Sequence, residues 1–252
     1  MTRAAAPRLR GAVSSSRPQW ARTVHRHLQV YVYLWLWFWA ICIVGAAVAV
    51  VVTDRFGTVN VSVLQFVRNG PMVWFLFALG IIVSTTYLGV HVANGMTRRS
   101  FVIGGLVAGV VAALLHAVTG AALLLLEGAL YDRMGWDHDA APGEQYVRGV
   151  WETGVGPLLL DHTLTTAAGV LTGMLVGITY YRLGGWWATL ALPLTMVPIL
   201  YVMFATSWSE APFVPWDLPP VSAHVSGGVG SVAAAVAFAL LARTVPITRS
   251  ES

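Results

Sequence analysis

Six long apolar runs constrain this chain more than any other feature. They are bounded by charged, proline-rich or glycine-rich segments and fall at about 29–53, 71–94, 101–126, 157–181, 186–206 and 222–243. A helix rises 1.5 Å per residue, so a run of about 20 apolar residues crosses a hydrocarbon core of roughly 30 Å. Because 57% of the 252 residues are hydrophobic and only 10% are charged, lipid takes the place of a soluble core. We therefore predict an all-α integral membrane protein with six transmembrane helices.

Charged residues divide between the connecting segments in a way that predicts orientation. One set of connections carries mainly arginine: the N-terminal tail, Arg98, Arg99, Arg182 and Arg243. The other set carries most of the acidic residues: Asp132, Asp137, Asp139, Glu144, Glu152, Glu210 and Asp217. Basic loops stay on the cytoplasmic side of a membrane. We expect a multi-pass protein of the cytoplasmic membrane with both termini in the cytoplasm.

The segment before the first run has an amphipathic pattern. Trp20, Val24 and Leu28 recur every four residues, so a helix over 17–28 would gather them on one stripe and lie in the membrane interface. The alternative is that the segment is the cytoplasmic start of a long first span. The preceding stretch is rich in Ala, Pro, Ser and Arg, which is typical of a disordered tail. We expect a disordered tail over 1–16 and an amphipathic helix over 17–28. A six-helix domain over 29–245 and a C-terminal cytoplasmic tail over 246–252 follow.

Residue usage excludes several chemistries. All fifteen basic side chains are arginine, so a Walker-type phosphate loop, a Schiff-base lysine and a Ser-Lys dyad are impossible. The single cysteine, Cys42, allows no intrachain disulfide and no cysteine metal knuckle. No nucleophile or metalloprotease motif is present. We expect a non-catalytic chain that binds membrane lipid rather than nucleic acid and has no metal site or cofactor of its own.

Small residues and prolines indicate how the runs pack. The fourth run carries Thr165, Gly169, Gly173 and Gly177 at four-residue spacing, which predicts close helix approach in lipid. Pro193 predicts a kink in the fifth run.

Four ionisable residues are expected at similar depth. Asp161 and His162 open the fourth run, His224 opens the sixth, and His116 lies in the outer third of the third. If they converge, the group could hold a proton, a divalent metal or a haem iron, as in a membrane oxidoreductase. Otherwise His162 and His224 lie in the outer interface and His116 bonds to a neighbouring helix. A small accessory or immunity protein that acts by binding is a further alternative.

A short basic loop joins the second and third runs. Its residues are Gly95, Met96, Thr97, Arg98, Arg99, Ser100 and Phe101. Gly95 permits a tight turn and Thr97 suits a helix cap, while Arg98 and Arg99 suit acidic groups on a partner. Positive-inside anchoring alone would also place two arginines here.

The chain resembles the membrane subunit of ABC-2 type transporters. The features that carry the resemblance are the six spans, the basic amphipathic start and the Gly-x-x-Arg-Arg-x-Phe loop. The resemblance covers about 20–245. It implies that the loop docks on a separate ABC ATPase subunit, which holds ATP and Mg²⁺. It also implies a second permease subunit, forming a homodimer, and export of a hydrophobic, amphipathic or peptide-like compound. The connection 207–221 is short and has four prolines, so the outer gate of larger members is not carried over.

Overall fold

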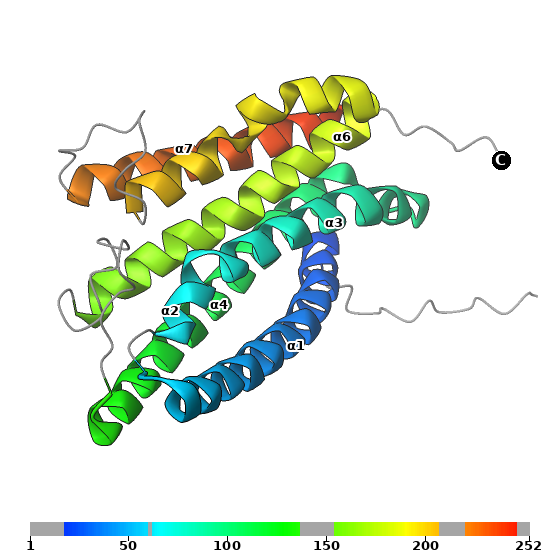
Figure 1. Cartoon of the computed structure of the whole chain (residues 1–252). Coiled ribbons are helices and arrows are strands. Elements are labelled where there is room, and N and C mark those ends of the chain that lie inside the picture. The colour runs from blue at the N-terminus through cyan, green and yellow to red at the C-terminus, as the bar shows by residue number, and fades with distance from the viewer. Residues whose placement is uncertain (1–17, 60–61, 137–153, 207–219, 246–252) are drawn as a thin grey trace, which may run out of the picture.

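The computed structural model describes residues 18–59, 62–136, 154–206 and 220–245, and every regular element in these ranges is a helix (Figure 1). The elements are α1 Gln19–Phe56, α2 Val63–Asn69, α3 Pro71–Ala93, α4 Arg98–Met134, α6 Val155–Thr206 and α7 Pro220–Thr244. Five helical segments are long and apolar enough to cross a membrane. The prediction of an all-helical chain is confirmed for the described residues, and the five apolar segments suggest a multi-pass membrane protein. The expected tails and most of the loop before the fourth run lie outside them.

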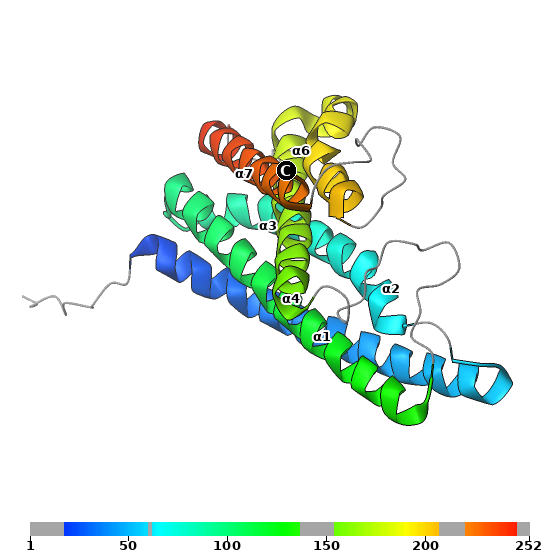
Figure 2. The same ribbon diagram turned by 90° about the vertical axis from the view of Figure 1, so that its left-hand side faces the viewer.

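Helix α1 is continuous from Gln19 to Phe56. The amphipathic segment 17–28, from Gln19 onward, is therefore the start of the same helix as the first apolar run. Its buried face includes Thr23, His27 and Tyr31, again at four-residue spacing. This face lies along α4 (Figure 2). A Cβ added at Gly104 of α4 would lie 2.5 Å from the Thr23 Cβ. The small residues of α4 therefore allow α1 to approach closely.

Helix α6 reverses direction at Gly184, whose φ of 75° is in the left-handed region (Figure 1). Gly169 and Ile199 lie equally far along the chain from this glycine, yet Gly169 lies against Val73 of α3 and Ile199 is buried in the same cluster as Val73. The fourth and fifth apolar runs are therefore two arms of one folded-back element. Pro193 lies within helical backbone. The break in the backbone therefore falls between the fourth and fifth predicted runs and not inside the fifth, where Pro193 lies.

The tightest helix contact joins α3 to the first arm of α6. A Cβ added at Gly173 would lie 2.0 Å from the carbonyl oxygen of Phe77. One added at Gly80 would lie 2.3 Å from the carbonyl oxygen of Val170. The two backbones touch with no room for a side chain, which confirms the close approach predicted from the glycine stripe of the fourth run.

The two ends of the helix bundle differ in charge. Hydrogen bonds join the α3–α4 loop to α1 and α7, from Thr97 N to Gln19 Oε1 at 3.2 Å and from Arg98 Nη1 to the Arg243 carbonyl at 3.2 Å. The basic end, as we name it, has the arginines Arg22, Arg26, Arg98, Arg99, Arg182 and Arg243. The acidic residues that the structure describes lie toward the opposite, acidic end: Asp54, Glu127, Asp132 and Asp161. Connections predicted to share a membrane side thus meet at one end of the bundle.

Candidate functional site

The loop between α3 and α4 is a compact, capped turn. The N–H of Gly95 donates to the Val92 carbonyl at 2.9 Å, and that of Met96 donates to the His91 carbonyl at 3.2 Å. These two bonds and the positive φ of Gly95 form a Schellman motif that ends α3. Thr97 then caps α4, since its hydroxyl accepts from Ser100 N at 3.2 Å. The turn and cap expected from the sequence are both present, and the capped helix is the long α4.

A buried histidine clamps this loop from inside. Nε2 of His91 lies 2.9 Å from the Ser100 hydroxyl and 3.2 Å from the Thr97 carbonyl oxygen. The Ser100 hydroxyl donates to the same Thr97 carbonyl at 2.7 Å. These contacts tie the loop to the last turn of α3, so the turn and that helix form one rigid unit.

The seven loop residues divide by exposure. Gly95, Thr97 and Arg99 are exposed, and Met96 and Arg98 are partly exposed. Ser100 and Phe101 are buried, and Phe101 packs edge-on against the rings of His27 and His91. A partner protein can therefore reach the two arginines but not Phe101. Phe101 instead anchors the loop to the core.

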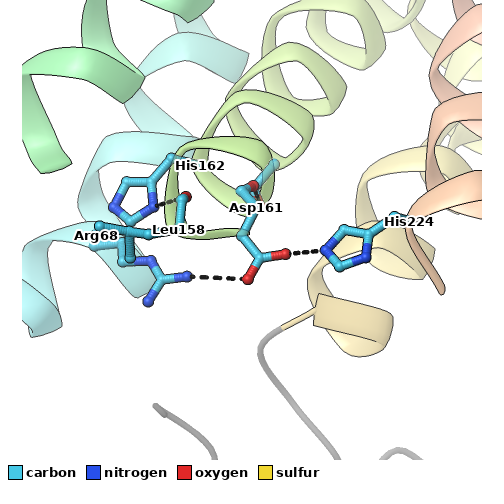
Figure 3. A network of polar contacts seen from close by, with 6 residues as sticks. Arg68, Leu158, Asp161, His162 and His224 are labelled. Atoms are coloured by element: carbon cyan, nitrogen blue, oxygen red, sulfur yellow. Dashed lines mark hydrogen bonds and ion pairs between the residues drawn. The ribbon is translucent and has the colours of Figure 1, made fainter. Parts of the chain in front are cut away.

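A second polar group lies at the acidic end (Figure 3). Asp161 of α6 points between Arg68 of α2 and His224 of α7. Nη2 of Arg68 is 3.9 Å from the carboxylate, an ion pair without a direct hydrogen bond, whereas Nε2 of His224 is hydrogen-bonded to it. The side chains of Arg68, Asp161 and His224 are 11%, 24% and 20% exposed. One carboxylate thus joins three separate elements.

The other two predicted members do not join this network. His162 turns toward its own helix, with Nδ1 2.8 Å from the Leu158 carbonyl oxygen (Figure 3). His116 is fully buried among the rings of Phe38, Trp39 and Phe75. Across the described ranges, no three His, Cys, Asp or Glu side chains are grouped to hold a metal ion. The predicted group of four divides into a partly buried ion network and two core histidines.

Helix α2, which supplies Arg68 as a partner to Asp161, was not predicted from the sequence. Ser62 caps α2 by accepting from Gln65 N at 3.1 Å, and its hydroxyl also donates to Glu127 of α4. The second carboxylate oxygen of Glu127 accepts from Leu64 N at 3.2 Å. Ser62-Val63-Leu64-Gln65 has the pattern of a capping box, which is the signal that would have predicted this helix.

Comparison with known proteins shows no match for this chain among family models, curated proteins or solved structures. The resemblance of the basic loop to ABC-2 permeases therefore stays a prediction.

Proposed function

We propose that the chain is the permease subunit of an ABC-2 type exporter in the cytoplasmic membrane. It crosses the membrane six times, pairs with a second copy, and moves a hydrophobic, amphipathic or peptide-like compound. A separate ATPase subunit supplies the energy, because a chain without lysine has no nucleotide-binding loop.

The construction of the α3–α4 loop carries this proposal. The loop is rigid, presents Arg98 and Arg99 at the surface, and is hydrogen-bonded to the starts or ends of three helices through Gln19, Thr97 and Arg243. A force on the loop would therefore be passed directly to α1, α3, α4 and α7. A coupling element requires this combination, whereas simple charge anchoring requires only the arginines.

The arrangement of the long helices supports six crossings. Helix α6 is 52 residues long, so each of its two arms has the length of a span, and the reversal at Gly184 places their connection at the basic end, next to Arg182. The Arg182 guanidinium donates to the Thr244 hydroxyl at the end of α7. With the basic end in the cytoplasm, every predicted span runs from one end of the bundle to the other.

The proposed substrate class is motivated by α3 and the second arm of α6, which meet through apolar side chains. Val73, Ile199 and Met203 are buried together there, with Phe77 and Met196 against them. Flexible methionine and aromatic side chains suit varied apolar surfaces. We expect the exported compound to pass along these two elements in the dimer.

The test is purification of the protein with its partners from native membranes. We expect an ATPase subunit with Walker motifs to co-purify with the wild type and to confer ATP hydrolysis. Arg98→Glu with Arg99→Glu should lower its recovery about tenfold or more, because opposed like charges cost several kcal/mol. Arg55→Glu with Arg133→Glu is the matched control, since it reverses two exposed arginines at the acidic end.

Two outcomes would contradict the proposal. In the first, the wild-type complex contains no nucleotide-binding chain and hydrolyses no ATP. In the second, the loop variant and the control variant recover the ATPase equally well.

A further inference from the structure

A pocket of about 230 Å³ opens between α1 and α3 at the basic end. Its walls combine charged, imidazole and amide side chains with the aromatic ring of Tyr87. Its polar lining includes Arg22, Thr23, Arg26, His27, His91 and Asn94. This pocket lies beside the basic loop but is formed by different arginines.

Among the described residues, no acidic side chain compensates the charge of this pocket. Arg22 and Arg26 lie one helical turn apart and form no ion pair with any described residue. The acidic side chains in the described part of the chain are all toward the acidic end. Two guanidinium groups next to an apolar phase attract an anion strongly, because the low dielectric weakens screening.

His27 forms the inner wall of the pocket. It is one of the lining residues and is only 2% exposed. Its Nδ1 is buried and lies near α4, since a Cβ added at Gly105 would be 4.0 Å from it. The groups that the pocket offers to a ligand are therefore the two exposed guanidinium groups of Arg22 and Arg26.

The surroundings of the pocket favour a lipid over a free anion. Toward the bundle centre, the exposed face of α1 becomes apolar and aromatic, with Tyr33 61% and Ile41 67% exposed. Trp20, Trp186 and Trp187 are exposed at the same end of the bundle, which is the level of an interfacial aromatic belt. The arginines thus lie at headgroup depth, and an apolar surface continues below them for acyl chains.

We propose that this pocket binds the phosphate of an anionic phospholipid from the leaflet at the basic end, with its acyl chains along α1. Arg22 and Arg26 hold the phosphate by charge-assisted hydrogen bonds. The site does not depend on the transport function proposed above, since it requires neither the ATPase nor the loop arginines.

The test measures lipid binding to the detergent-purified full chain by native mass spectrometry. Phosphatidylglycerol, phosphatidylcholine and glycerol 3-phosphate are the probes. Each arginine near an anionic lipid contributes roughly fivefold in affinity, so Arg22→Gln with Arg26→Gln should weaken phosphatidylglycerol binding about 30-fold. The charge-matched control is Arg55→Gln with Arg133→Gln, which should bind like the wild type. Should the double variant fail to elute as a single species, Arg26→Gln alone should bind about fivefold more weakly.

The probes separate the possible outcomes. Preference for phosphatidylglycerol that is lost only in the pocket variants supports the proposal. Equal binding of phosphatidylcholine, or unchanged phosphatidylglycerol binding in the pocket variants, overturns it. Binding of glycerol 3-phosphate as tight as that of the lipid would assign the pocket to a free phosphate and would also overturn it.

Discussion

The contact between α3 and α6 leads to a sharp prediction for Gly173→Ala. The added Cβ would lie 2.0 Å from the Phe77 carbonyl oxygen, whereas ordinary contact begins at 3.4 Å. The two helices must therefore separate locally by about 1.4 Å, the difference between these distances. The obstacle is backbone, so no side-chain rotation can relieve it.

The free energy of unfolding should fall by about 2 kcal/mol. Overpacking a tight interface costs roughly 1 to 3 kcal/mol, and a backbone clash of this depth belongs at the upper end. Replacing glycine by alanine inside a helix stabilises the folded state by about 1 kcal/mol through helix propensity. The difference between about 3 and about 1 kcal/mol gives the expected loss.

Denaturation in mixed detergent micelles, followed by helical circular dichroism, measures this change. Gly45→Ala in α1 is the matched control, because a Cβ there meets nothing within 4 Å. It gains the same helix propensity without a clash and should be neutral or stabilising by up to about 1 kcal/mol.

Equal stability of the two variants would refute the reasoning. It would mean that α3 and α6 do not approach through Gly173, and that the arms of α6 are placed differently against α3.

Two further substitutions test the acidic end and the basic loop by the same denaturation assay. Asp161→Asn leaves the largely buried Arg68 without its carboxylate and should destabilise the protein by about 2 kcal/mol. This is less than the 3–5 kcal/mol of fully buried pairs, because the carboxylate is 24% exposed. No loss of stability relative to a control variant at an exposed aspartate, Asp54→Asn, would show that the network is not formed. Gly95→Ala should destabilise the protein by roughly 1 kcal/mol, because a φ of 73° is costly for an L-residue even where the space is open. The control Gly156→Ala is equally unobstructed and has no positive φ, so it should lose no stability. If Gly95→Ala also lost no stability, the turn at Gly95 would not have the conformation described.

Much of the helix layout could be predicted from the sequence because it depends on local properties. The predicted run 71–94 corresponds to α3, Pro71–Ala93, and the run 222–243 lies within α7, Pro220–Thr244. The basic loop could be located and its turn and cap expected, because Gly95 and Thr97 act through their immediate neighbours. The length and apolarity of a segment can be read directly from its own residues. A segment able to cross a membrane can therefore be recognised without knowledge of the helices that pack against it.

The tertiary structure decided which side chains meet. Asp161 and His162 are adjacent in sequence, yet successive positions on a helix point about 100° apart. One therefore reaches Arg68 and His224, while the other enters the core. The partners of Asp161 lie more than 60 residues away along the chain, at positions fixed by the rotation of each helix about its axis. That rotation is set by the packing of whole helix faces, and no local pattern in the sequence specifies it.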